Sequence, residues 1–436
     1  MKNTKTKAPV IRRKPYTLKT LTNGLRILTV PMNNPTATVL VLVEAGSKYE
    51  SKTQNGISHF LEHMCFKGTD KRPNSSDIVR ELDTLGTQYN AFTGQEYTGY
   101  YAKGRATQVY ELIDIVSDLY LNPTLPESEI EKEKGVIRDE INMYEDTPSR
   151  KVHDVFQELL YGNTPAGRTI SGSKERVSGF KRKDFIKYRT AHYVPNATTI
   201  IVAGDIDTKK VELDITKHFK LAEKSKKDKK PKVVEKQSKP ALKIEYKKTD
   251  QSHIVLGFRS LDTYHKDSVV VSMLAGVLGA GMSSRLFAKV RDEMGCGYYV
   301  GAHNDTDTDT GVLMLRAGVA PERAGEVVGA LLAECQKLRD KLVPEVELEK
   351  VKSIIAGSIF MGLESTDAVA EYYGTQAILY KELKTPIEVE AMYRGVTAKD
   401  IQRLAKKICV TKNLNLAVIG PHKSGKEFDK AIKEYR

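Results

Sequence analysis

The chain has 436 residues, of which 40% are hydrophobic and 29% are charged, a composition typical of a globular protein with a full core. This length predicts two or three domains. The longest apolar run, residues 37–43, is too short to cross a membrane, and residues 1–15 lack the apolar segment of a signal peptide. The four cysteines are widely spaced without a CxxC pair, which favours reduced thiols in a cytoplasmic protein.

The net charge of +13 would suit a nucleic-acid-binding protein if it lay on the folded surface. However, residues 1–19 hold seven basic and no acidic residues, and residues 224–239 hold a net charge of +6. These two segments account for the whole excess, so we expect a nearly neutral folded body and no nucleic-acid partner. Pro9 and Pro15 favour a basic tail at 1–15, and a mitochondrial targeting segment is the alternative.

In chain order, β-branched residues predict strands at 25–30 and 38–43, and 55–68 predicts a helix between an Asn-Gly turn and a glycine. Further helices follow, and the first part closes with a strand at 196–204. The Lys-rich segment 223–240 predicts an exposed linker, because it has few apolar residues and its charges repel one another. The second part begins again with strands, predicted at 242–246, 253–258, 313–317 and 413–420.

The two parts resemble each other in sequence. LPESEIEKEKGVI at 125–137 aligns with VPEVELEKVKSII at 343–355, which indicates an internal duplication. We therefore predict an α+β protein of two homologous domains, 16–222 and 241–436. Each domain is expected to be a mainly antiparallel sheet covered by helices on one face.

The predicted helix at 55–68 has two different faces. Ile57, Phe60, Leu61 and Met64 fall on one side, which predicts a core-facing surface, whereas His59, Glu62 and His63 fall on the other. His59 and His63 are four residues apart, so both imidazoles can reach one Zn²⁺. Glu62 then lies beside the metal as a candidate general base. This H-x-x-E-H pattern is typical of one class of zinc peptidases.

A catalytic zinc needs a third protein ligand, and the helical segment 131–144 offers Glu133 and Glu140, two turns apart on one side. Both border an apolar stripe of Ile130, Ile137, Ile141 and Tyr144. The aligned positions of the second half are Val351 and Ser358, and that half has no H-x-x-E-H motif. The duplicate thus keeps the helix and lacks the candidate ligands, which indicates that these serve chemistry.

HFLEHMCFKGT at 59–69 resembles the zinc signature of the pitrilysin/insulinase/mitochondrial-processing-peptidase family of zinc metallopeptidases. The resemblance runs from about residue 16 to 436 and implies one Zn²⁺ per chain. The family spacing selects Glu140 as the third ligand and makes Glu133 the acidic residue that supports a ligand. It also implies a substrate-binding edge strand, with Asn90 near the metal, formed by Asn90, Ala91, Phe92 and Thr93.

In the second half, SSRLFAKVRDEMGCGY at 283–298 resembles the substrate element of the same family. The resemblance implies that Arg291 binds a substrate carbonyl and that Tyr298 stabilises the oxyanion. Chains of this length in the family pair into a chamber, which implies a homodimer, or a heterodimer, that cleaves peptides or unfolded proteins away from membranes. A non-catalytic structural or partner subunit with the same fold is the alternative function.

Overall fold

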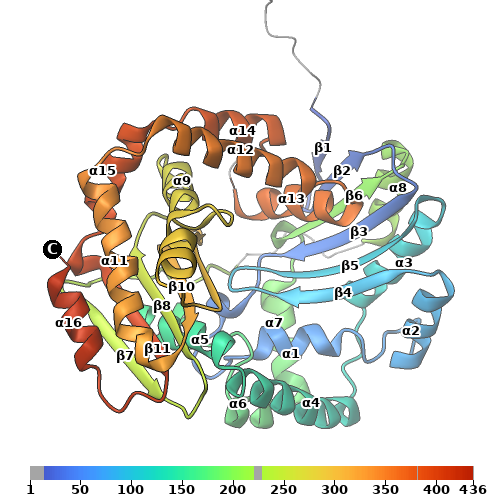
Figure 1. The fold of residues 1–436 in the computed structure, drawn as a ribbon. Coiled ribbons are helices and arrows are strands. Elements are labelled where there is room, and N and C mark those ends of the chain that lie inside the picture. The colour runs from blue at the N-terminus through green and yellow to red at the C-terminus, as the bar shows by residue number, and fades with distance from the viewer. Residues whose placement is uncertain (1–13, 220–227, 381, 436) are drawn as a thin grey trace, which may run out of the picture.

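The computed structural model describes residues 14–219, 228–380 and 382–435, which form two halves, each built on one sheet (Figure 1). Most of the predicted tail at 1–15 and residues 223–227 of the predicted linker lie outside the described residues. Within the described residues, no helix is both long enough and apolar enough to span a membrane.

The first sheet has six strands in the order β1-β2-β6-β3-β5-β4, and β2–β6 is its parallel pair. Its strand β4 lies at an edge. The β-branched runs 25–30 and 38–43 form β2 and β3, so both predicted strands are confirmed. The strands are β1 (Thr17–Thr20), β2 (Arg26–Pro31), β3 (Thr36–Val43), β4 (Gln88–Thr93), β5 (Thr98–Arg105) and β6 (Thr198–Gly204).

The second sheet has five strands in the order β7-β11-β8-β10-β9, with β7–β11 as its parallel pair. This order repeats the β2-β6-β3-β5-β4 part of the first sheet, so the two halves share one topology and both sheets are mainly antiparallel. The predicted α+β class is confirmed. The strands are β7 (Ala241–Tyr246), β8 (Ser252–Arg259), β9 (Tyr299–Thr306), β10 (Gly311–Val319) and β11 (Leu414–Gly420).

Helices pack on these sheets in both halves (Figure 1). The aligned segments 125–137 and 343–355 lie in α4 and α12. The first half contains α1 (Ile57–Met64), α2 (Ser75–Thr84), α3 (Val109–Leu121), α4 (Glu127–Glu145), α5 (Pro148–Tyr161), α6 (Lys174–Gly179), α7 (Arg182–His192) and α8 (Thr208–His218). The second half contains α9 (Ser268–Gly279), α10 (Arg285–Phe287), α11 (Ala324–Asp340), α12 (Glu345–Met361), α13 (Thr366–Leu379), α14 (Pro386–Arg394), α15 (Ala398–Ile408) and α16 (Lys426–Glu434).

The expectation that helices cover only one face of each sheet is wrong, because the halves exchange helices. Helix α13 of the second half packs on β2, β3 and β6, and α5 of the first half packs on β8, β10 and β11. Strands β3 and β6 are almost continuously apolar, a pattern of strands buried on both faces. The second buried face is thus visible in the sequence, but the helix that covers it, α13, begins 162 residues after β6 ends.

The described part of the predicted linker, 228–240, has mostly exposed side chains but does not run free of the body. Lys230 forms ion pairs with Glu96 of the first half and Asp309 of the second. Gln237 accepts a hydrogen bond from Arg259. The segment therefore lies along the seam between the halves.

Candidate metal centre

Helix α1 is fixed at its N-terminus by a buried carboxylate. Glu50 accepts hydrogen bonds from the backbone N–H groups of Gly56 and Ser58, both at 2.8 Å. Gly56 has φ = 96° and lies where a side chain would collide with the carbonyl oxygen of Ser171, so only glycine fits there. The predicted core face is confirmed, since its four apolar side chains are all fully buried: Ile57, Phe60, Leu61 and Met64.

The opposite face of α1 meets α4, and three ligand-type atoms converge between them. The Nε2 atoms of His59 and His63 are 3.3 Å apart, and Oε2 of Glu140 is 3.6 Å from each. The circumradius of a triangle with these sides is about 2.0 Å, which matches zinc–nitrogen and zinc–oxygen bonds of ~2.0–2.2 Å. Within the described residues this is the single His/Cys/Asp/Glu group that could hold a metal ion.

Glu133 lies directly behind His63. The Nδ1–H of His63 donates to Oε1 of Glu133 at 2.9 Å, and Lys67 contacts the other oxygen at 2.6 Å. Burial raises the pKa of Glu133, but the hydrogen bonds from His63 and Lys67 outweigh it and leave the pKa lowered. The ionised carboxylate therefore holds the Nδ1 proton, which leaves Nε2 of His63 as the ring nitrogen that faces the metal position.

The donor set fits Zn²⁺, for which two imidazoles and one carboxylate are a known catalytic combination. Burial, and then the neighbouring His63, lower the pKa of His59 to about 4, so this ring is neutral and can act as a ligand near pH 7. Its Nδ1 is buried without a hydrogen-bond partner among the described residues. Tyr144 donates to Oε1 of Glu140 at 2.8 Å and so orients that carboxylate.

Glu62 lies one turn from His59 and is held by the edge strand. Oγ1 of Thr93, at the end of β4, donates to Oε2 of Glu62 at 2.6 Å. Burial raises the pKa of Glu62, and the hydrogen bond from Thr93 lowers it by less. A raised pKa makes this carboxylate a stronger base, and its place beside the metal position suits a group that accepts and returns a proton.

The predicted substrate segment 90–93 lies on β4, at an edge of the first sheet. Thr93 and Ala91 face α1, since Thr93 bonds Glu62 and Ala91 packs against the core that includes α1. Asn90 and Phe92 alternate to the other face. Asn90 accepts a hydrogen bond from the N–H of Ala91, and strand alternation directs its side chain to the face opposite α1.

The second-half residues Arg291 and Tyr298 are both exposed. Arg291 donates to the carbonyl oxygen of Gly297 at 2.6 Å, and Tyr298 is 67% exposed. Neither forms a hydrogen bond or ion pair with His59, His63 or Glu140 within the described part of the chain.

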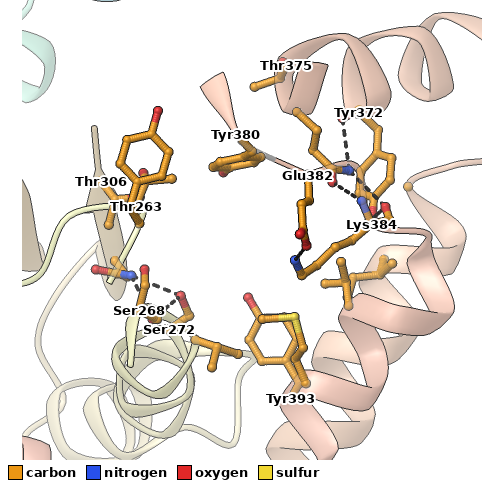
Figure 2. Close-up of a pocket in the computed structure, with 18 of the residues that line it drawn as sticks. Thr263, Ser268, Ser272, Thr306, Tyr372, Thr375, Tyr380, Glu382, Lys384 and Tyr393 are labelled. Carbon is orange, nitrogen blue, oxygen red and sulfur yellow. Dashed lines mark hydrogen bonds and ion pairs between the residues drawn. The ribbon is translucent and has the colours of Figure 1, made fainter. Parts of the chain in front are cut away.

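A cavity of about 960 Å³ lies between α9, α13 and α14 (Figure 2). Its walls carry many hydroxyl groups, but several of these bond within the protein: Tyr372 donates to the carbonyl oxygen of Lys384, and Tyr264 to that of Leu379. None of the predicted zinc or substrate residues is among the described residues that line it. The cavity is thus separate from the candidate metal centre.

Three supporting residues were not predicted as part of the site: Glu50, Lys67 and Tyr144. Lys67 and Tyr144 each follow a functional residue by four positions, and this spacing, which places side chains on one helical face, could have identified them. Tyr144 was predicted as part of an apolar stripe, but it is half-buried and bonds Glu140. No comparable spacing in the sequence identifies Glu50, because its hydrogen-bond partners Gly56 and Ser58 lie beyond a turn.

The fold and the converging side chains define a two-domain α+β protein with a candidate catalytic metal centre of the His-His-Glu type. Residues 26–174 match the family model described as "Insulinase (Peptidase family M16)", and residues 179–355 match the one described as "Peptidase M16 inactive domain". The chain belongs to this peptidase family, as the zinc signature at 59–69 predicts.

Several relatives match along almost the whole chain. An uncharacterized zinc protease of Bacillus subtilis, YmxG, is 34% identical over 406 residues, which cover 92% of this chain and 97% of the relative. An uncharacterized zinc protease of Streptomyces coelicolor is 30% identical over 411 residues (93% and 89%). A protease from Helicobacter pylori has the same fold, with a TM-score of 0.85 at 24% identity over 93% of this chain and 99% of that one.

Proposed function

We propose that the protein is a zinc-dependent endopeptidase that hydrolyses unstructured peptides or unfolded proteins. The observation that carries this proposal is the convergence of His59, His63 and Glu140 beside the carboxylate of Glu62. The three converging side chains would hold one Zn²⁺ per chain. When bound, the ion supplies a Lewis acid that lowers the pKa of water and polarises a carbonyl group.

The protein's own groups divide the remaining work. Glu62 accepts a proton from the attacking water and returns it to the leaving amine, while Thr93 holds its carboxylate in place. Glu133 fixes the tautomer of His63, and Lys67 balances the charge of Glu133. Tyr144 orients Glu140.

We further propose that the peptide adds as a strand to the free edge of β4, at residues 90–93. Such pairing uses backbone hydrogen bonds and gives affinity with little sequence preference. Residues 16–222 would form the catalytic domain and 223–240 the linker, and residues 241–436 would supply Arg291 and Tyr298. Because these two side chains are exposed and form no hydrogen bond or ion pair with the cluster among the described residues, they would bind substrate at the centre of a partner subunit in a dimeric chamber.

The proposal is tested with Glu62→Gln, which keeps the shape of the side chain and removes its basicity. We expect zinc content equal to that of the unmodified protein, with cleavage of an unstructured fluorogenic peptide reduced at least ~100-fold. Glu131→Gln, at an exposed position of α4, is the matched control and should retain full activity. Undiminished cleavage by Glu62→Gln, or no cleavage by the zinc-loaded unmodified protein, would refute the proposal, and the second result would favour a non-catalytic subunit.

A further inference from the structure

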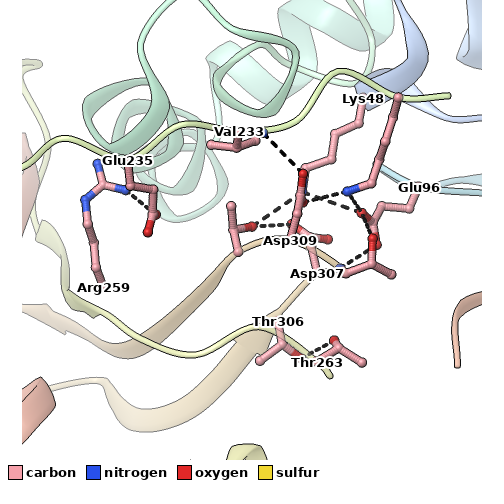
Figure 3. A network of polar contacts seen from close by, with 12 residues as sticks. Lys48, Glu96, Val233, Glu235, Arg259, Thr263, Thr306, Asp307 and Asp309 are labelled. Atoms are coloured by element: carbon pink, nitrogen blue, oxygen red, sulfur yellow. Dashed lines mark hydrogen bonds and ion pairs between the residues drawn. The ribbon is translucent and has the colours of Figure 1, made fainter. Parts of the chain in front are cut away.

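Lys48 is a buried lysine at the seam between the two halves (Figure 3). Its side chain is 1% exposed, and its ammonium group lies 2.6 Å from Asp307 and 3.0 Å from Asp309. Both acids belong to the turn 307–310, which joins β9 and β10 of the second half. Burial lowers the pKa of Lys48, but the neighbouring carboxylates outweigh it and leave the pKa raised. The lysine is therefore charged and ties η1 (Ser47–Tyr49) of the first half to a turn of the second.

Glu96 makes a second connection at the same place. This buried carboxylate of the first half accepts hydrogen bonds from the backbone N–H and Oγ1 of Thr308, at 2.9 and 2.8 Å. It also lies 3.7 Å from Lys48 and forms an ion pair with Lys230 of the predicted linker. We refer to these six residues as the seam cluster: Lys48, Glu96, Lys230, Asp307, Thr308 and Asp309.

The seam cluster holds the turn 94–97, which joins β4 to β5. The N–H groups of Ser47 and Lys48 donate to the carbonyl oxygens of Gly94 and Gln95, at 3.2 and 2.8 Å. A side chain at Gly46 would come within 2.4 Å of the carbonyl oxygen of Gly94, so the two backbones are in close contact. The turn is thus packed against η1 on one side and bound to the second half through Glu96 on the other.

This turn leads directly to the candidate metal centre. Thr93 precedes Gly94 and donates its hydroxyl hydrogen to Glu62. Only two residues, Gly94 and Gln95, separate Thr93 from Glu96. A displacement of Glu96 would therefore have to pass through a backbone segment of only two residues to reach the Thr93 hydroxyl.

We propose that the second half positions the carboxylate of Glu62 through the seam cluster, with Glu96 and Thr308 as positioning residues. Thr308 fixes Glu96, Glu96 fixes the turn 94–97, and the turn sets the direction of the Thr93 hydroxyl. The proposal rests on the proposed function in that Glu62 is taken as the proton acceptor of a peptidase. It gives the second half a role in the chemistry of the metal centre in its own chain.

The test compares Glu96→Gln and Thr308→Ala with Asp367→Asn in the zinc-loaded protein. Asp367 of the second half forms an ion pair of 2.7 Å with Lys103 of the first half. This ion pair also joins the halves, and it includes no residue of the turn 94–97. Misplacement of a reacting group by a fraction of an ångström slows the chemical step, so we expect kcat to fall about tenfold in the two seam variants, with KM within about twofold. Zinc content should not change, and Asp367→Asn should keep the unmodified kcat.

A double-mutant cycle with Thr93→Val separates positioning from a general loss of stability. If Glu96 acts through Thr93, Glu96→Gln should lower kcat about tenfold in the unmodified background and less than about twofold in the Thr93→Val background. An equal loss in both backgrounds would overturn the proposal. So would an Asp367→Asn variant that loses as much activity as the seam variants.

Amide hydrogen exchange gives a readout that does not depend on cleavage. Residues 88–97 of the zinc-loaded protein should exchange faster in Glu96→Gln and Thr308→Ala than in the unmodified protein, and Asp367→Asn should leave their exchange unchanged. If the unmodified protein fails to cleave peptides, the proposed function fails and faster exchange still supports positioning by the second half. Unchanged exchange in both seam variants would overturn it whether or not the protein is a peptidase.

Discussion

The contact between Phe156 and Gly257 shows how the exchanged helix α5 is held. The ring of Phe156 is fully buried against the second sheet. A side-chain carbon added at Gly257 would lie 2.5 Å from Cζ of this ring and 2.8 Å from Cγ1 of Val312. The aromatic ring from the first half therefore fills a space that exists only because residue 257 of the second half has no side chain.

This geometry gives magnitudes for three variants. Phe156→Ala should lower the free energy of unfolding by about 4 kcal/mol, because Gly257 has no side chain that can move into the cavity. Gly257→Ala alone should lower the free energy of unfolding by about 1–3 kcal/mol through overpacking. In the double variant the new methyl group occupies part of the vacated space, so the combined cost should be smaller than the sum by at least about 1 kcal/mol.

Urea unfolding measures all three values. It can be followed by far-UV circular dichroism and by tyrosine fluorescence, since the chain has 21 tyrosines and no tryptophan. Because the exchanged helices join the halves, both probes should report one coincident transition. Leu213→Ala, at an exposed position of α8, is the control and should change stability by less than about 0.5 kcal/mol. The proposed contact would be refuted if the two single variants lowered the free energy of unfolding additively, or if Phe156→Ala had a negligible effect on it.

Glu133→Gln should weaken zinc binding about 10–100-fold in chelator competition, because His63 loses its charged acceptor. Asp139→Asn on the same helix is the control. Equal zinc affinities of Glu133→Gln and the unmodified protein would contradict this prediction. Burial raises the pKa of Glu50 from 4.5 to about 7, so this group takes up a proton on folding. Proton uptake by Glu50 contributes fully to the free energy of unfolding below pH 4.5, and about 3 kcal/mol of this free energy is lost as the pH rises to 7. Glu50→Gln should remove that slope from the pH dependence of unfolding, and an unchanged slope would contradict the assignment. Removal of zinc by a chelator should abolish peptide cleavage and zinc should restore it; cleavage that persists without metal would count against the proposed chemistry.

Local features of the sequence were sufficient to place most strands and the faces of α1. Strand and helix periodicities depend on neighbouring residues, so the apolar face of α1 and the H-x-x-E-H face opposite it follow from the order of side chains alone. The repeated segments in α4 and α12 likewise indicate two halves of one fold. The choice between Glu133 and Glu140 came from the family resemblance, because both lie on the same side of α4.

Only the tertiary structure decided how these parts meet. It brings Glu140 within 3.6 Å of both histidines and places Glu133 behind His63. It also shows that α5 and α13 cover the sheet of the opposite half and that Lys48 joins the two halves. These contacts connect residues far apart in the chain, and many different pairings bury the same apolar area. The sequence therefore determined the chemical groups and the local elements, whereas long-range packing determined which of them act together.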